Sequence, residues 1–368
     1  MEFNHLHLYV DDLAPWRQRF LTNWAGTVTP QTDPQRDHTA LIYLGQVPLL
    51  LSDRRCSAVQ SYLHRHPPGI GDLALRVGHL ETTLDRLAGA GGKLHTPIEI
   101  DALGRGRWCQ VQGWGSLRHT LIESCRGEAW VPDHPTHPLP PRSAPSAIDG
   151  IDHAVLNVSG EDFPRALAWY VNQLGFQPQQ RFTITTPWSG LQSVVLAHPQ
   201  GGAQLPVNQP TDPNSQIQEF LHWNRGAGIQ HVALHTSDIL HTVDQLKRSG
   251  VEFIDVPPSY YQALAQRPSY QVDPTLETGL NQLKILMDWD GTLPQARLLQ
   301  TFTQPLLDIP TLFFEVIQRQ VVEINGLSHR ARGFGQGNFQ ALFEAIEAEQ
   351  RQRRTLDVPG QGISEARS

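Results

Sequence analysis

Two histidines and one glutamate stand at positions where a metal site could form. His153 and His231 each occupy the third place of a strand-like run, and Glu315 lies in the strongly apolar segment 310–317. Burying a carboxylate without a partner is costly, so Glu315 needs a cation nearby. Two neutral imidazoles and one carboxylate, with coordination positions left open, form the ligand set of non-haem Fe(II) oxygenases. We therefore predict that these three residues hold one metal ion.

The chain repeats one pattern four times, and this repeat would bring the two histidines together. Each copy opens with a strand-like run, followed by an amphipathic helix and two or three further strand-like runs. The opening runs are 3–10, 71–77, 151–158 and 229–235. The predicted unit is β-α-β-β-β and the predicted fold class is α+β, with two units in each of two open β-barrel-like domains. Equivalent positions of paired copies meet about a pseudo-twofold axis, so His153 and His231 should converge.

A single histidine in a strand is more often an ordinary hydrogen-bonded side chain than a ligand, and the matched repeat positions are what favour a metal. His235 shares a strand face with His231, but at about 3.3 Å per residue it lies about 13 Å away. The first two copies keep His5 and have Asp72 at the second imidazole position, and we match Glu123 to the C-terminal glutamate. We predict that these N-terminal copies are structural and bind no metal.

A proline-rich stretch divides the chain into two parts. Proline fits poorly into helices and sheets, so this stretch is predicted to be a linker. After the fourth copy we predict a helix that Asn338 caps, with Phe339 on its apolar face, and this helix is the expected lid of the site. The predicted parts are a structural domain over 1–126, the linker over 127–149, a catalytic domain over 150–353 and a disordered tail over 354–368.

Composition excludes several classes of function. The formal charge is −7, without a run of like charges, which argues against a nucleic-acid or anionic-membrane partner. Three cysteines without C-x-x-C spacing indicate neither a disulfide framework nor a thiolate zinc site. No apolar stretch reaches the roughly 18 to 20 residues of a membrane span, and the first residues do not look like a signal peptide. We expect a cytoplasmic protein.

The sequence resembles the 4-hydroxyphenylpyruvate dioxygenases, a family within the vicinal-oxygen-chelate (glyoxalase-like) superfamily. The resemblance covers nearly the whole chain and is strongest over 150–350. It implies an iron enzyme that converts 4-hydroxyphenylpyruvate and O2 to homogentisate and CO2, with one Fe(II) per chain held by His153, His231 and Glu315, and a homo-oligomer, either a dimer or a tetramer. The runs that carry it are 151–153, 170–176, 226–233, 250–253, 258–261, 298–303 and 333–339.

The resemblance also implies a substrate pocket. Ser193, Asn208 and Gln300 would supply the hydroxyl and amide groups that orient the phenol, and phenylalanine rings would form the walls. Strand alternation supports part of this set, because Phe313 shares a face with Glu315. Gln230 belongs to the implied pocket, yet as the neighbour of His231 on a strand it should point away from the metal. The whole implied set is Ser193, Asn208, Gln216, Gln230, Gln300, Phe302, Phe313, Phe334 and Phe339.

Two alternatives remain open at this stage. Hydroxymandelate synthase resembles the same family and uses the same substrate and iron but hydroxylates the benzylic carbon; the run Leu205–Asn208 favours the dioxygenase. A metal-free small-molecule binding module of the same superfamily is the second alternative, and both histidines with Glu315 argue against it. The chain departs from the family pattern at Gln209, where an acidic residue is usual, and at Gln192, where many members have asparagine.

Overall fold

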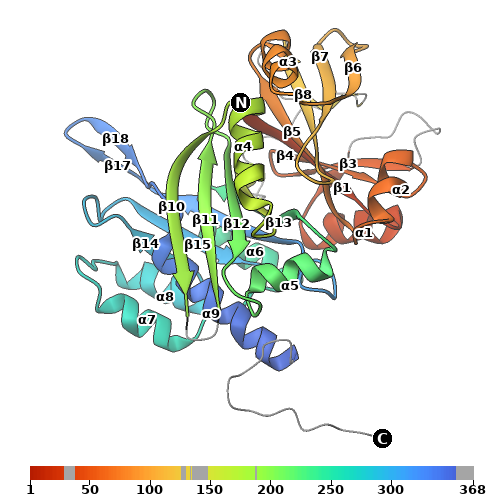
Figure 1. Cartoon of the computed structure of the whole chain (residues 1–368). Helices are drawn as coiled ribbons and strands as arrows, with labels where there is room; N and C mark the ends of the chain where they lie inside the picture. The colour runs from red at the N-terminus through yellow and green to blue at the C-terminus, as the bar shows by residue number, and fades with distance from the viewer. Residues whose placement is uncertain (29–37, 126–129, 133, 135–147, 187–188, 354–368) are drawn as a thin grey trace, which may run out of the picture.

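The computed structural model describes residues 1–28, 38–125, 130–132, 134, 148–186 and 189–353 (Figure 1). These residues form two eight-stranded mixed sheets with helices packed on them, and a separate two-stranded hairpin. The first sheet contains β1 (Glu2–Tyr9), β2 (Thr27–Val28), β3 (Thr39–Leu44), β4 (Val47–Ser52), β5 (Gly69–Val77), β6 (Leu94–Ile100), β7 (Gly106–Gln112) and β8 (Arg118–Ser124). The second contains β9 (Ile148–Asn157), β10 (Gln177–Thr185), β11 (Gly190–Ala197), β12 (Gln204–Pro210), β13 (Gly228–Thr236), β14 (Leu286–Trp289), β15 (Arg297–Phe302) and β16 (Phe313–Arg319).

The two sheets have the same strand order, which confirms the predicted fourfold repeat. The orders are β2-β3-β4-β1-β5-β8-β7-β6 and β10-β11-β12-β9-β13-β16-β15-β14. In each sheet the opening strands of two units pair antiparallel at the centre, β1 with β5 and β9 with β13. Each opening strand pairs parallel with the last strand of its own unit, for example β13 with β16. The residues of β9, β13 and β16 therefore lie side by side at the middle of the second sheet.

One helix of each unit packs against the apolar face of its sheet. These are α1 (Leu13–Asn23), α3 (Leu80–Gly89), α4 (Phe163–Leu174) and α6 (Ile239–Arg248). Asp238 caps α6 by accepting a hydrogen bond from the amide of His241, and Gly175 ends α4 with a left-handed φ of 76°. Two short helices, α2 (Ser57–Leu63) and α5 (Gln216–Trp223), join successive units.

The fourth unit is longer than predicted because two helices are inserted before its second strand. They are α7 (Pro258–Ala265) and α8 (Pro274–Leu283). The second strand of this unit, β14, therefore begins only at Leu286. The reason is local, since the Asp273 carboxylate accepts hydrogen bonds from the Thr275 and Leu276 amides and Pro274 occupies the first turn.

The chain ends in a hairpin and a long helix. The hairpin of β17 (Val321–Ile324) and β18 (Leu327–Arg330) projects away from the second sheet, and α9 (Gln336–Arg353) runs past β14 and α5 (Figure 1). The helix begins at Gln336, two residues before the predicted cap. Asn338 is fully buried inside it, and its amide bonds Gln300 and Tyr260 instead of capping the helix.

The predicted domain limits fall partly outside the described residues. Of the linker over 127–149, Trp130 and Val131 are described and buried, while 127–129, 133 and 135–147 lie outside the description, as does the tail over 354–368. Strand β9 already begins at Ile148, so the predicted linker ran two residues too far.

The two halves share one apolar core. The Phe314 ring in β16 packs against Trp24 at the end of α1, with ring centroids 4.9 Å apart, and His119 Nε2 lies 3.1 Å from the Tyr170 hydroxyl. None of the helices in the described part of the chain is long and apolar enough to cross a membrane.

Candidate metal centre and its pocket

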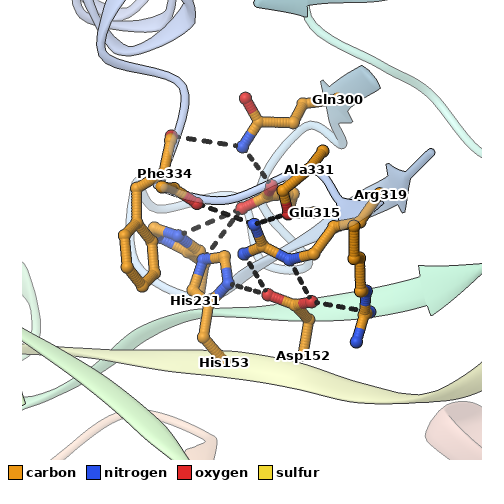
Figure 2. Close-up of polar contacts among 10 residues, drawn as sticks. Asp152, His153, His231, Gln300, Glu315, Arg319, Ala331 and Phe334 are labelled. Atoms are coloured by element: carbon orange, nitrogen blue, oxygen red, sulfur yellow. Dashed lines mark hydrogen bonds and ion pairs between the residues drawn. The ribbon is translucent and has the colours of Figure 1, made fainter. Parts of the chain in front are cut away.

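The three residues predicted as metal ligands meet at one point in the second sheet. Glu315 Oε2 lies 3.2 Å from His153 Nε2 and 3.6 Å from His231 Nε2. One atom from each residue lies within 4.8 Å of the other two, and all three side chains are buried (Figure 2). Among the described residues this is the one group of three or more histidine, cysteine or acidic side chains so arranged.

Strand register explains this convergence. Ala233 in β13 is the pairing partner of His153 in β9 and also of Glu315 in β16, so these two ligands flank Ala233 in one row across three strands. His231 lies two residues before Ala233, on the same face of β13. Paired residues point to the same face of a sheet, and the methyl group between the two ligands leaves room for an ion. His235 lies outside this row, where its ring approaches Asp149 at 3.7 Å.

The hydrogen bonding of the three side chains is what a cation site requires. His153 Nδ1 donates to Asp152 Oδ1 at 2.9 Å, His231 Nδ1 lies 3.3 Å from Gln230 Oε1, and Glu315 Oε1 accepts from Gln300 Nε2 at 2.7 Å. The inner atoms, Nε2 of both histidines and Oε2 of Glu315, are buried without a hydrogen-bond partner. Buried polar atoms rarely stay unsatisfied, and a divalent cation would satisfy all three at once.

The pKa values of the two histidines also indicate a site for positive charge. Burial lowers the pKa of His153, but the Glu315 and Asp152 carboxylates outweigh this effect and raise it to about 9. Burial and the charge of His153 hold the pKa of His231 well below its usual range. The two carboxylates beside His153 therefore favour positive charge at this point, as expected of a cation site.

Two charged residues next to the site were missed by sequence reasoning. Burial raises the pKa of Asp152, yet hydrogen bonds from Arg319 and His153 outweigh burial and hold it far below its usual range. Arg319 is the last residue of β16 and is 7% exposed. The available signal was an arginine closing an otherwise apolar strand, because a buried guanidinium needs an acidic partner.

A small pocket with two phenylalanine rings in its wall lies beside His231. It has a volume of about 30 Å³ and is lined by residues that include Gln216, Gln230, Phe302, Phe313 and Ile346. The Phe313 ring stacks on the His231 imidazole at 4.8 Å between centroids, and Phe302 meets the same imidazole edge-on at 6.2 Å.

The expected position of Gln230 was wrong in part. The pairing of β13 with β9 shifts register between Ile229 and His231, which makes Gln230 the extra residue of a β-bulge. Alternation of faces fails at a bulge, so Gln230 lines the cavity and contacts the His231 ring instead of pointing away.

The other residues of the implied pocket lie around the same region. Ser193 pairs with Asn208 across β11 and β12, and Ser193 Oγ and Gln216 Oε1 are buried without a partner. Phe334 lies edge-on against His153 at 5.1 Å, and the Phe339 ring lies 5.4 Å from Phe182.

Asn157 is a further polar residue on this face that sequence reasoning missed. It is fully buried at the end of β9, on the same face as His153, and its Oδ1 accepts from Asn208 Nδ2 at 3.2 Å. Its Nδ2 has no hydrogen-bond partner. The two departures from the family pattern contact each other nearby, since Gln209 Nε2 donates to Gln192 Oε1 at 2.5 Å.

The N-terminal half has different residues at the positions equivalent to His231 and Glu315. Asp72 pairs with Arg118 as His231 pairs with Phe313, so the residue equivalent to Glu315 is Thr120. The predicted match of Glu123 to Glu315 was therefore wrong. Glu123 instead accepts a hydrogen bond from the amide of Leu80 at the start of α3, as Gln318 does from Ile239 at the start of α6.

Asp72 is fully satisfied without a cation. Its carboxylate accepts hydrogen bonds from Thr120 N at 2.9 Å, Thr120 Oγ1 at 2.7 Å and Gln110 Nε2 at 2.5 Å. No unpartnered inner atoms comparable to those of His153, His231 and Glu315 remain on Asp72 or His5.

Comparison with known proteins identifies the family of the chain. Residues 150–266 match the model of the Glyoxalase/Bleomycin resistance protein/Dioxygenase superfamily. An uncharacterized protein of Synechocystis is 36% identical over 98% of this chain and 100% of its own length. A 4-hydroxyphenylpyruvate dioxygenase of Caenorhabditis briggsae is 36% identical over 80% of this chain and 76% of its own length.

A solved structure is similar over almost the whole chain. It is a triple mutant of 4-hydroxymandelate synthase from Streptomyces coelicolor, which is 25% identical, has a TM-score of 0.78 and is matched over 95% of this chain and 98% of its own. This structure carries the same fold, while the level of identity is higher to the dioxygenases. The chain belongs to the 4-hydroxyphenylpyruvate dioxygenase family, within the glyoxalase and dioxygenase superfamily.

Proposed function

We propose that this protein binds one Fe(II) per chain through His153, His231 and Glu315 and converts 4-hydroxyphenylpyruvate and O2 to homogentisate and CO2. The observation that carries the proposal is the set of three unpartnered inner atoms, which face one another beside an aromatic cavity. Their outer atoms are all held by hydrogen bonds, as expected of ligands with fixed orientation. Family membership supports the substrate.

When bound, Fe(II) supplies a Lewis-acid centre for a 2-oxo acid and the redox chemistry that O2 requires. The protein's own residues bind and orient the substrate. Phe302 and Phe313, which flank His231, would hold the ring and exclude water, and Ser193, Asn208 and Gln300 would orient the phenol. Gln216 Oε1, which is buried without a partner, is a further acceptor for the substrate. The overall reaction balances, because one oxygen atom enters the new carboxylate and the other enters the ring.

The rival reaction is benzylic hydroxylation to 4-hydroxymandelate, and the similar synthase structure is the observation in its favour. The run Leu205–Asn208 favours the dioxygenase. It lies on β12, where Pro206 is two residues before Asn208. The two products are isomers of equal mass. A product analysis must therefore separate them by retention time as well as identify them by mass.

The test is incubation of the full chain with Fe(II), ascorbate, O2 and 4-hydroxyphenylpyruvate. We expect homogentisate, and a metal analysis of one iron per chain. His231→Ala should lose most bound iron and all turnover, because one of three ligands is missing. His235→Ala, on the same strand but outside the row of ligands, is the matched control and should keep both. Full iron occupancy with normal turnover in His231→Ala would contradict the proposal, and 4-hydroxymandelate as the product would establish the rival reaction.

The proposal extends to the location of the protein, its subunits and its small-molecule partners. We propose that the protein acts in the cytoplasm as a homo-oligomer with 4-hydroxyphenylpyruvate and O2 as its small-molecule partners. Sedimentation of the purified chain would give the number of subunits.

A further inference from the structure

Asp152 and Arg319 form a buried ion pair directly behind His153. Arg319 Nε donates to Asp152 Oδ2 and Arg319 Nη2 donates to Asp152 Oδ1, both at 2.7 Å. The same Oδ1 accepts from His153 Nδ1 at 2.9 Å. Both side chains of the ion pair are 5% exposed. The carboxylate is therefore fixed by two parallel hydrogen bonds, and it in turn fixes the plane and the tautomer of the imidazole (Figure 2).

The third nitrogen of the guanidinium reaches the segment that leads into α9. Arg319 Nη1 donates to the carbonyl oxygen of Gly333 at 2.7 Å and approaches that of Ala331 at 3.4 Å. The guanidinium carbon also lies 5.7 Å from the centre of the Phe334 ring, whose edge contacts the His153 imidazole. Residues 331–334 thus touch both ends of the chain of contacts that runs from Arg319 through Asp152 to His153 (Figure 2).

The N-terminal half shows what the same strands look like without this pair. His5 and Asn4 stand where His153 and Asp152 stand, with His5 Nδ1 2.7 Å from Asn4 Oδ1. By the register that equates Thr120 with Glu315, the counterpart of Arg319 is Ser124. Among the matched positions, the buried ion pair occurs only beside the three unpartnered inner atoms. The N-terminal half thus orients its histidine with an uncharged amide, whereas His153 is held by a carboxylate that is paired with a guanidinium.

We infer that Asp152 and Arg319 are positioning residues that couple the orientation of His153 to the placement of residues 331–334, and hence to closure of α9. This inference rests on the proposed function, because it takes His153 as a metal ligand. If segment 331–334 moves away, Arg319 loses its carbonyl acceptors while it is still buried. The two hydrogen bonds from Arg319 to Asp152 should then change in geometry. Coupling is reciprocal, so metal binding should also tighten the segment.

The test uses the full chain, with metal binding and backbone hydrogen exchange as its two readouts. Asp152→Asn keeps an acceptor for His153 Nδ1 but removes the ion pair. Arg319→Met removes the link to residues 331–334, and the double variant Asp152→Asn with Arg319→Met avoids leaving either charge buried alone. The matched control is Arg330→Met, since the Arg330 guanidinium lies 3.7 Å from Asp152 Oδ2 but its side chain is 53% exposed.

Expected results are specific to each readout. In the wild type, Co(II) or Fe(II) should slow exchange of the amides in 331–340. In Asp152→Asn and in the double variant, the metal dissociation constant should rise about 10- to 100-fold. At saturating metal the amides of 331–340 should no longer gain protection in these variants, and the Co(II) absorption spectrum should change. Arg330→Met should match the wild type in all three measurements.

Failure of the inference differs from failure of the proposed function. Dissociation constants within twofold of the wild type, together with unchanged metal-dependent protection in the double variant, would overturn the inference and leave the proposed iron site standing. A wild type that binds no divalent metal would overturn the proposed function. In that case, faster exchange of 331–340 in metal-free Arg319→Met alone would show only that Arg319 holds the segment, and the coupling to a metal would be refuted.

Discussion

Asn157 forms a pair of amides with Asn208 on the sheet face that carries His153. Its Oδ1 holds Asn208 Nδ2, while its own Nδ2 is buried without a partner, so it can donate to an oxygen atom of a bound substrate. Asn157→Ala should raise KM for 4-hydroxyphenylpyruvate about 5- to 30-fold, which corresponds to about 1 to 2 kcal/mol. Iron content should stay at the wild-type level, because Asn157 contacts none of the three ligands. A parallel fall of iron content and activity would mean that Asn157 supports the sheet and not the substrate.

Individual site residues could be predicted where the sequence carries a physical conflict. Glu315 could be identified because a carboxylate inside an apolar strand demands a partner, and the two histidines because they recur at repeat-equivalent positions. Gln230 was misplaced because of a β-bulge, and Glu123 because of strand register. A β-bulge changes the facing of one residue, and strand register decides which residues are neighbours, and neither is visible in the order of residues along one chain.

At the scale of elements, α9 contributes part of the wall of the pocket beside His231. Ile346 lines the cavity, and Asn338 links the helix to Gln300, the residue that holds Glu315 Oε1. The far half of α9 is held by Glu347, which is 2% exposed and whose carboxylate accepts from Thr186 Oγ1 at 2.5 Å and Ser189 Oγ at 2.8 Å.

Glu347→Ala should therefore loosen the closed state of α9 without touching the ligands. Loss of hydrogen bonds to a buried carboxylate costs about 1 to 3 kcal/mol, so exchange of the α9 amides should speed up about tenfold or more. Water would enter the pocket during turnover, and the ratio of homogentisate formed to O2 consumed should fall below that of the wild type. Iron content should be unchanged.

The exposed Glu344, one turn earlier on the same helix, provides the control for this prediction. Glu344→Ala should keep the wild-type ratio of product to O2. If Glu347→Ala also keeps that ratio and the wild-type rate, α9 is a structural cover with no part in catalysis.

The elements themselves were predictable where the repeat dictated them. The opening strand and the helix of each unit follow from apolar periodicity, and the ends of α6 and α4 follow from Asp238 and Gly175. The inserted helices α7 and α8 did not follow, because they belong to one copy and the other copies offer no template. The start of α9 was misplaced since Asn338 resembles a cap in sequence, whereas tertiary contacts with Tyr260 and Gln300 use its amide.

At the scale of the whole molecule, the two halves differ in how the polar atoms at equivalent positions are bonded. In the C-terminal half three of these atoms lack a hydrogen-bond partner, whereas in the N-terminal half the Asp72 carboxylate is hydrogen-bonded by the protein. Both halves place a histidine at the same point of the opening strand, His5 and His153. Beside His153 lies an unpartnered carboxylate oxygen, whereas beside His5 lies an Asp72 carboxylate whose hydrogen bonds come from the protein. The shared core around Phe314, Phe20 and Trp24 joins the halves, so the stability of the N-terminal half bears on the site in the other.

This arrangement predicts that acid destabilises the molecule through His5. Burial lowers the pKa of His5 to about 4, even though the Asp72 carboxylate favours the charged form. In the unfolded chain the pKa is about 6.5, so between pH 6.5 and 4 the unfolded state binds a proton that the folded state does not. Stability from the neutral imidazole is therefore present above pH 6.5 and is lost as the pH falls toward 4.

Between pH 7 and pH 5, His5 should account for about 2 kcal/mol of the loss in free energy of unfolding. The measurement is urea unfolding of metal-free wild type and His5→Gln at both pH values, with the exposed His64→Gln as control. Glutamine cannot take up the proton, so His5→Gln should lose about 2 kcal/mol less than the wild type over this range, and His64→Gln should follow the wild type. Because protonation of the metal ligands is common to all three proteins, the difference isolates His5. If wild type and His5→Gln lose the same free energy of unfolding between pH 7 and pH 5, the pKa of His5 is not lowered by burial. The N-terminal half could then hold a positive charge at His5, and its assignment as a purely structural half would be contradicted.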